Sequence, residues 1–371
     1  MAKLGDIATY INGYAFKPQD WSDEGIPIIR IQDLTGNSYQ ANRYNGEYAS
    51  KYEVNDGDVL ISWSASLGVY IWHGEKAVLN QHIFKVVFDK ERISKDFFVH
   101  QVGLILENAA SDAHGATMKH LTKPVFDALP FYLPPYEKQC EIAEVLDKVT
   151  NLISLRKQQL SKLDELVKAR FVEMFGDPVV NSKRWPVETI ENHIDLLTGF
   201  PFDSSGYVSK GVNICGGLII MPQKIDWSAC KHWPQITGYE DYILRPNDIV
   251  IALDRPWISN GFKIAMVDKE HLPALLIQRT ARIRAVDINQ HYLMQSLLLG
   301  RFDKHCNITG SLVPHISPKD IKSYSIMIPP IELQNQFASF IERVNQQKQT
   351  VQQSLEKLEL MKKARMQEYF G

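Results

Sequence analysis

Two stretches of this 371-residue chain match each other at a constant offset, and this internal repeat constrains the fold more than any other feature. Leu133-Pro134-Pro135-Tyr136-Glu137-Lys138-Gln139 corresponds to Ile328-Pro329-Pro330-Ile331-Glu332-Leu333-Gln334, an offset of 195 residues from Pro134 to Pro329. The same offset aligns Lys168-Ala169-Arg170 with Lys363-Ala364-Arg365, and Phe175-Gly176 with Phe370-Gly371. A repeat of this kind indicates that one structural unit occurs twice.

The segment after each Pro-Pro pair contains no Gly or Pro and has apolar residues at heptad spacing, which predicts a long helix. A helix of about 38 residues is roughly 57 Å long. Its apolar seam is narrow, so each helix needs a partner, and we expect the two copies to pair as an antiparallel coiled coil. Two helices in a compact bundle are the alternative. The expected seam residues are Leu146, Ile153, Leu160, Leu163 and Val167 in the first copy, and Ile341, Val344, Val351, Leu355 and Leu358 in the second.

The regions before the two helices alternate short apolar runs with turns, which is typical of α/β domains. Asp56-Gly57-Asp58-Val59 resembles Pro246-Asn247-Asp248-Ile249, a turn followed by a strand. The expected fold is α+β: two α/β domains separated by two long helices that form an antiparallel coiled coil, in a pseudo-two-fold tandem repeat. The expected segments are domain 1 (1–133), spacer helix 1 (134–176), a linker (177–184), domain 2 (185–328) and spacer helix 2 (329–371).

The charge of the chain does not resemble that of a stand-alone nucleic-acid-binding protein, which usually carries a basic excess. The net charge is −2, and residues 1–130 and 177–325 sum to −4 and +1. If the chain binds DNA, a local patch or a partner must neutralise most of the phosphates. The four cysteines are scattered, with no paired spacing, and the apolar runs are too short to span a bilayer. We expect a cytoplasmic protein with no metal, no cofactor and no membrane contact.

Polar loops next to predicted strands are the candidate DNA-binding sites. Gln and Asn can bond adenine bidentately, Arg and Lys can bond guanine, and Ser and Thr can bond either base. Gly residues in such loops allow the backbone to approach phosphate closely. The candidates are Arg30, Gln32, Ser62, Ser64, Asn80, Gln81, His82, Lys119 and His120 in the first domain, and Arg255, Ser259, Asn260, Gln278, Arg279, Ser311 and His315 in the second.

Structural roles are open for several of these residues. Arg30 and Gln32 alternate with isoleucines, which is also the pattern of a solvated strand face. His120 and His315 recur at the repeat offset and can equally serve to satisfy loop hydrogen bonds. Trp63 and Trp257, which stand within the same loops, are expected to be packing residues.

The order of variable domain, Pro-Pro-x-Glu-x-Gln helix, variable domain and second such helix resembles the specificity subunits of type I restriction–modification systems over the full chain. The match lies in Pro134, Pro135, Glu137, Gln139 and Phe171 to Gly176, with their repeats Pro329, Pro330, Glu332, Gln334 and Met366 to Gly371. The resemblance implies that both variable domains are target-recognition domains, and that each reads one half of a bipartite, asymmetric double-stranded DNA target. It also implies partners: two methyltransferase subunits and translocating endonuclease subunits, which together modify DNA and defend the cell against foreign DNA.

Two other readings remain open. Leu133-Pro134-Pro135-Tyr136 is similar to the Asn/Asp-Pro-Pro-Tyr motif of amino-methyltransferases, but leucine cannot accept the hydrogen bonds of a target amino group. The chain also has no Gly-x-Gly-x-x-Gly, ATP-binding or His-Glu-x-x-His motif, so we expect a non-catalytic subunit rather than a diverged methyltransferase. A protein-interaction scaffold built on the coiled coil is the other alternative, and it would not need the polar loops.

Overall fold

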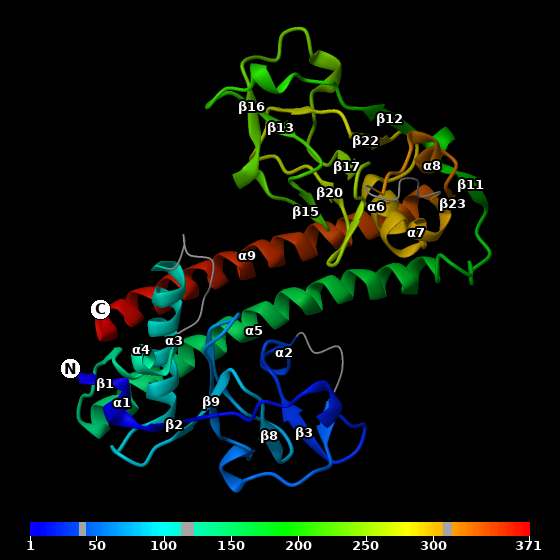
Figure 1. Ribbon diagram of the computed structural model, residues 1–371. Coiled ribbons are helices and arrows are strands. Elements are labelled where there is room, and N and C mark those ends of the chain that lie inside the picture. Colours follow the sequence, from blue (N-terminus) through cyan, green and yellow to red (C-terminus); the bar gives the residue numbers. More distant parts are fainter. Residues whose placement is uncertain (37–41, 113–121, 307–313) are drawn as a thin grey trace. The chain divides into compact units, whose positions relative to one another are not determined.

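The computed structural model describes residues 1–36, 42–112, 122–306 and 314–371. The chain divides into two compact units, Met1–Lys157 with Gln353–Gly371, and Gln158–Gln352. Helices α5 (Tyr136–Phe175) and α9 (Ile331–Phe370) each lie partly in the first unit and partly in the second (Figure 1). These units do not test the five segments expected from the repeat, because each unit contains parts of both long helices. The expected segment boundaries therefore remain a prediction.

The first unit is built on two four-stranded sheets. One has the order β2-β9-β6-β7 and is antiparallel; in the other, β4-β3-β8-β5, strands β3 and β8 run parallel. The β-branched run Val59-Leu60-Ile61 forms β6, which is buried on both faces, as a central strand requires. Helix α3 places Phe97 and Phe98 in the same core. The bounds are β2 (Thr9–Asn12), β3 (Ile26–Ile29), β4 (Arg43–Tyr44), β5 (Glu53–Val54), β6 (Val59–Ser62), β7 (Gly68–Ile71), β8 (Ala77–Leu79), β9 (Ile83–Val87) and α3 (Lys95–Asp112).

The second unit repeats this plan. Its sheets have the orders β12-β22-β17-β20 and β16-β13-β21, and β13 and β21 again run parallel. The bounds are β12 (Ile194–Thr198), β13 (Val212–Cys215), β16 (Lys231–Trp233), β17 (Ile249–Ala252), β20 (Ile264–Met266), β21 (Ala274–Leu276), β22 (Thr280–Ala285) and α6 (Gln290–Leu299).

Short elements complete both units. In each, one short strand near the start pairs antiparallel with the strand that precedes the long helix, β1 with β10 and β11 with β23. Ser317 is the N-cap of α8, where its side chain accepts a hydrogen bond from Asp320 N. The bounds are β1 (Ala2–Lys3), α1 (Leu4–Ile7), α2 (Ile31–Leu34), α4 (Lys123–Asp127), β10 (Pro130–Phe131), β11 (Val187–Thr189), β14 (Ile220–Met221), β15 (Lys224–Ile225), β18 (Trp257–Ile258), β19 (Gly261–Phe262), α7 (Phe302–His305), α8 (Pro318–Lys322) and β23 (Ser325–Met327).

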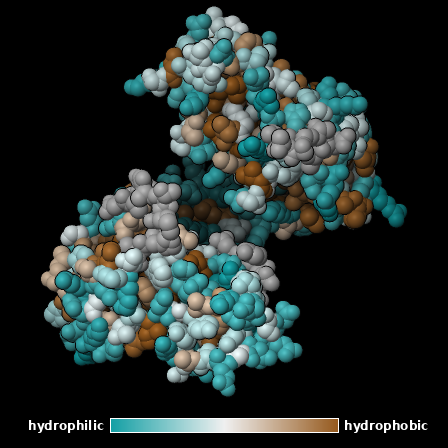
Figure 2. Space-filling model, in the orientation of Figure 1, coloured by the Kyte–Doolittle hydropathy of each residue, from teal (hydrophilic) through white to brown (hydrophobic). Residues whose placement is uncertain are grey.

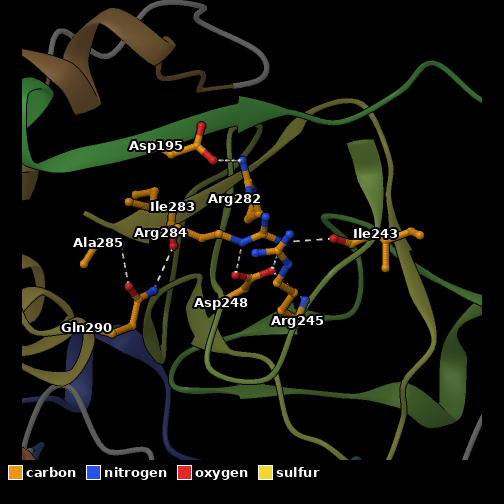
Figure 3. A network of polar contacts seen from close by, with 9 residues as sticks. All are labelled: Asp195, Ile243, Arg245, Asp248, Arg282, Ile283, Arg284, Ala285 and Gln290. Carbon is orange, nitrogen blue, oxygen red and sulfur yellow. Dashed lines mark hydrogen bonds and ion pairs between the residues drawn. The ribbon is translucent and has the colours of Figure 1, made fainter. Parts of the chain in front are cut away.

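The same polar anchor holds the turn before the central strand in both units. In the second unit Arg284 bonds both carboxylate oxygens of Asp248, at 2.6 and 2.8 Å, and the carbonyl of Ile243 at 3.0 Å (Figure 3). In the first unit Lys85 contacts Asp58 at 3.0 Å and the carbonyl of Glu53 at 2.6 Å. In the first unit Lys85 pairs with Leu60 of the central strand. In the second unit the residue that pairs with the equivalent Val250 is Arg282, not Arg284. The cation therefore lies two residues further along the strand in the second unit, on the same face.

The long helices pack against each other antiparallel within each unit. In the first unit Lys157 pairs with Glu359 at 3.0 Å, and in the second Asp164 pairs with Lys348 at 2.6 Å. Phe171 and Phe337 pack in the second unit with ring centroids 5.5 Å apart. The residues expected on the seam differ in how deeply they are buried. Six seam residues are buried and four are half-buried: Leu146, Val167, Ile341, Val344, Val351 and Leu355, and Ile153, Leu160, Leu163 and Leu358.

A buried glutamine joins each long helix to the domain that precedes it. Gln139 Nε2 donates to the carbonyl of Pro134 (2.9 Å), and its Oε1 accepts from Ser94 N (2.9 Å). Gln334 makes the same two bonds, with Pro329 and Asn289 N, at 2.8 Å each. Both side chains are 1% exposed. The Gln of the Pro-Pro-x-Glu-x-Gln motif thus satisfies buried and partly buried backbone groups where strand, helix and domain meet.

Candidate nucleic-acid interface

Two loops meet at one end of the first sheet of the second unit. One follows β17 and carries Asp254 and Arg255; the other precedes β22 and carries Gln278 and Arg279. The N–H of Leu253 donates to the carbonyl of Arg279 at 2.9 Å and fixes one loop against the other. Both loops begin or end on the paired residues Ala252 and Thr280, so the rigid sheet positions them.

Two arginines of these loops have a left-handed backbone, with φ of 45° at Arg255 and 65° at Arg279. This conformation costs a residue other than glycine about 1–2 kcal/mol. The first unit has left-handed residues at the matching positions, Ala65 (φ 59°) and His82 (φ 73°). There the N–H of Trp63 donates to the carbonyl of His82 at 3.2 Å, as Leu253 does to Arg279. The two units thus share one loop geometry and differ in the side chains that it presents.

Asp254 organises the polar groups of the second unit's loops. Its carboxylate contacts Arg279 Nη1 at 2.5 Å and His315 Nδ1 at 2.7 Å. Burial acts to raise the pKa of Asp254, but the hydrogen bonds and charges of Arg279 and His315 outweigh it, so the pKa lies below its usual value. Asp254 is therefore ionised at neutral pH and holds Arg279 in one orientation, while 71% of the Arg279 side chain stays exposed.

A groove of about 520 Å³ opens beside these loops. Buried lining residues such as Ile214 and Ile219 are apolar. Among the lining residues that the structure describes there are four cationic side chains and one carboxylate, which belongs to Asp254. The cations are Lys231, Arg255, Lys263 and Arg279. This excess of positive charge is the local patch that the near-neutral sum over the second domain requires of a DNA-binding surface.

Lys263 is a buried lining residue of the groove. Its side chain is buried, and its ammonium donates to the carbonyl of Gly217. Burial and the nearby charge of Arg255 lower the pKa of Lys263. The residue after that carbonyl, Leu218, is 89% exposed and also lines the groove. Lys263 thus fixes the loop that presents an apolar side chain next to the cations.

In the first unit a close backbone contact fixes the loop before β9. Tyr14 N donates to the carbonyl of Leu79 and Gln81 N to the carbonyl of Tyr14, both at 2.8 Å. A Cβ atom on Gly13 would lie 2.0 Å from the carbonyl oxygen of Asn80, so only glycine fits. Gly199 stands in the same relation to Ile277 in the second unit, also at 2.0 Å. The similarity of Gly13-Tyr14-Ala15-Phe16 to Gly199-Phe200-Pro201-Phe202 thus has a structural cause.

The family model of the type I restriction modification DNA specificity domain matches residues 1–165 and 235–360, which are most of the chain. The chain belongs to this family. The type I restriction enzyme MjaVIII specificity subunit of Methanocaldococcus jannaschii is 25% identical over 386 residues, covering 98% of this chain and 90% of that protein. The EcoBI specificity subunit of Escherichia coli is 29% identical over 228 residues, which are 61% of this chain and 44% of that protein.

The fold is also shared with a solved specificity subunit. The crystal structure of the S subunit of a type I restriction–modification system from M. genitalium matches with a TM-score of 0.55. Sequence identity is 13%, and the match covers 100% of this chain and 95% of that one. The family and the fold expected from the tandem repeat are thereby confirmed for this specificity subunit.

The structure places the described candidates of the second domain in two groups. Arg255, Gln278 and Arg279 line the groove, and His315 joins them through Asp254. Ser259 and Asn260 are exposed at the tip of the β18–β19 hairpin. Trp257 stacks on Phe262 with centroids 4.9 Å apart, which confirms its expected packing role.

The first domain's candidates are less exposed. Asn80, Gln81 and His82 are half-buried in the loop before β9. Ser62 and Ser64 are buried, and the Ser62 hydroxyl donates to the carbonyl of Ser66 at 2.6 Å, so we leave both serines out of the proposed reading surface. Trp63 stacks on Phe84 with centroids 5.6 Å apart and donates to Asn12 Oδ1, and it is a packing residue as expected.

Arg30 and Gln32 do not lie on a strand face, and this alternative is wrong. Strand β3 ends at Ile29, and Arg30 is the N-cap of α2, where its N–H donates to Asp33 Oδ2 at 2.8 Å. The Arg30 side chain donates to Asn42 Oδ1 at 3.0 Å and its guanidinium lies 5.1 Å from the Trp21 ring centre. Gln32 is half-buried within α2. Lys119, His120 and Ser311 lie outside the described residues.

Three residues at the groove of this specificity subunit were not predicted from its sequence. Asp254 organises the loops, Lys263 supports the groove and Leu218 is exposed beside it. A buried lysine within an apolar strand pattern gives no sequence signal. Within 1–36, 42–112, 122–306 and 314–371, no group of three or more His, Cys, Asp or Glu side chains could hold a metal ion. None of the helices within these ranges combines the length and the apolar character of a membrane span. On the face drawn in Figure 2, hydrophobic residues form separate patches between hydrophilic ones.

Proposed function

We propose that this specificity subunit reads a bipartite, asymmetric double-stranded DNA target, one half-site with each variable domain. The observation that carries the proposal is the repeated pair of loops: one backbone geometry, including its left-handed residues, presents Ala65 and His82 in one domain and Arg255 and Arg279 in the other. Two related surfaces with different side chains suit two different half-sites. The cationic groove of the second domain supports phosphate or guanine contact.

The proposal also covers the partner subunits and the absence of catalytic activity in this chain. The chain itself is non-catalytic, and it assembles in the cytoplasm with two methyltransferase subunits and, through that complex, with endonuclease/translocase subunits. The near-neutral charge of the chain supports this division of labour, because partners would supply most of the phosphate contacts. The paired long helices support a role in setting the separation of the two half-sites.

Methylome sequencing of the source cell with and without this gene tests the proposal. We expect a bipartite methylated motif that disappears when the gene is deleted. A purified complex with the cognate methyltransferase should bind the motif at physiological salt, whereas the chain alone should bind it weakly. An unchanged methylome contradicts the proposed function and favours a scaffold that binds protein only. Methyl transfer by the chain alone, given S-adenosylmethionine and DNA, contradicts the non-catalytic assignment.

A further inference from the structure

The left-handed residues of the two loops lie at equivalent places in both domains. Ladder register fixes the equivalence: Val59 pairs with Val86 in the first domain, and Ile249 with Ile283 in the second. Counting along the chain from these pairs makes His82 equivalent to Arg279, in the loop before the last strand of the pair, and Ala65 equivalent to Arg255, in the loop after the central strand. We name the positions of Ala65 and Arg255 the first corner, and those of His82 and Arg279 the second corner.

The corners keep their backbone although their residues differ. Alanine, histidine and arginine all adopt a positive φ there, and in both domains the same hydrogen bond joins the loops that carry the corners. Surrounding structure must therefore impose the conformation, since alanine and arginine rarely adopt it on their own. A position whose backbone is fixed by the fold and whose side chain is free to differ is suited to setting specificity.

The side chains at the second domain's corners have the chemistry of guanine readers. Both arginines line the groove, and Asp254 holds Arg279 while leaving 71% of its side chain exposed. A guanidinium in a fixed orientation can donate two parallel hydrogen bonds to O6 and N7 of guanine. In the first domain Ala65 presents only a methyl group, and His82 lies edge-on to Trp63 with ring centroids 4.9 Å apart.

We infer that the two corners are the specificity-determining positions of both domains, and that Arg255 and Arg279 select guanine in the half-site of the second domain. Asp254 is a positioning residue for Arg279. The inference rests on the proposed function and names which side chains make the choice. It also implies that the corresponding positions of the first half-site are read without an arginine.

Glycine substitutions test this without straining the backbone, because glycine adopts a positive φ readily. The chain and its methyltransferase subunits are purified as a complex and given a plasmid library of random sequence, and the methylated sites are sequenced. Arg279→Gly and Arg255→Gly should each make one guanine position of one half-site degenerate, with a loss of discrimination of about 5- to 150-fold. The other half-site should not change. Arg301→Gly is the matched control, since Arg301 is an exposed arginine with φ 61° that does not line the groove.

Two further variants separate base reading from charge and from folding. Arg279→Lys keeps the positive charge but lacks the planar guanidinium that donates two parallel hydrogen bonds in a fixed geometry, so it should retain methylation while discriminating less at that guanine. His82→Gly should alter one position of the first half-site only. Thermal denaturation checks that each variant is folded.

The inference is overturned if Arg279→Gly and Arg255→Gly leave every motif position unchanged while methylation persists, or if Arg301→Gly changes the same guanine. An unchanged first half-site in His82→Gly overturns it for the first domain. A wild-type complex that methylates without any sequence motif refutes the proposed function itself, so the two failures are distinguishable.

Discussion

Arg279 and Asp254 form an ion pair of 2.5 Å in which the carboxylate is mostly shielded and the guanidinium is mostly exposed, at 21% and 71% of their side chains. The pair spans two loops that also share the hydrogen bond from Leu253 N to the carbonyl of Arg279. Such an arrangement orients a cation towards solvent without withdrawing it from a ligand. It also makes the stability of the loops depend on the ionisation of one carboxyl group.

Asp254→Asn should lower the free energy of unfolding by up to about 1 kcal/mol at pH 7, since the pair is partly exposed. The pKa of Asp254 is lowered in the folded chain, so its contribution is present above the unfolded value and is lost as the pH falls through the folded one. Denaturant unfolding at neutral and acidic pH should show wild type and variant converging below the usual aspartate range. Asp241→Asn, at an exposed aspartate, should show no such convergence, and parallel curves for Asp254→Asn contradict the prediction.

Gly13→Ala should destabilise the first domain by about 1–3 kcal/mol or more, because the new methyl carbon would lie 2.0 Å from the carbonyl oxygen of Asn80. Gly103→Ala in α3 is the control. Its methyl carbon would meet Val69 at 3.6 Å, an ordinary contact, and alanine favours a helix by roughly 0.5–1 kcal/mol over glycine. Thermal unfolding monitored by circular dichroism measures both. Equal midpoints for Gly13→Ala and the wild type would show that the loop can move aside.

Gln334→Ala should cost about 1–3 kcal/mol, because it leaves the partly buried Asn289 N–H and the buried carbonyl of Pro329 without their partner. Gln346→Ala, on the exposed face of the same helix, should change stability by a few tenths of a kcal/mol at most. Hydrogen exchange at the start of α6 gives a local measurement, since the Asn289 amide should lose protection in the first variant alone. Retained protection would mean that water replaces the glutamine.

A four-residue insertion after Lys157 lengthens α5 by roughly 6 Å. Because a base pair rises about 3.4 Å, the preferred spacer between the half-sites should grow by one or two base pairs. Four residues do not match a 3.5-residue repeat, so the helix pair should unwind locally and some affinity should be lost. Sequencing of sites methylated by the insertion variant reads the spacer directly. Unchanged spacing with full activity would show that helix length does not set it.

The sequence predicts the elements whose signal is local or repeated at one offset. The two long helices and the turn before each central strand appear where the pattern indicates. The glutamines of the Pro-Pro-x-Glu-x-Gln motif were identified too, but their hydrogen bonds to Ser94 and Asn289 join residues 45 apart and give no local signal.

The correspondence between the loops of the two domains was harder to predict from the sequence, because insertions change the offset between equivalent residues along the domains. Gly13 and Gly199 differ by 186 residues, Ala65 and Arg255 by 190, and His82 and Arg279 by 197. A loop comparison by residue type pairs Asn80 with Gln278, whereas the bridges from Tyr14 to Asn80 and from Phe200 to Ile277 show that Ile277 is its counterpart. Lys263 and the shift from Lys85 to Arg284 depend on three-dimensional packing and could not be predicted.

The glutamine junction has a consequence for how such chains can diversify. Gln139 and Gln334 recognise the preceding domain through a main-chain N–H, from Ser94 in one case and Asn289 in the other. A main-chain donor is the same whatever residue carries it. If each variable domain reads one half-site as proposed, replacing one domain at Pro134 or Pro329 should therefore preserve its junction with the long helix, because the glutamine needs only a main-chain N–H from the incoming domain.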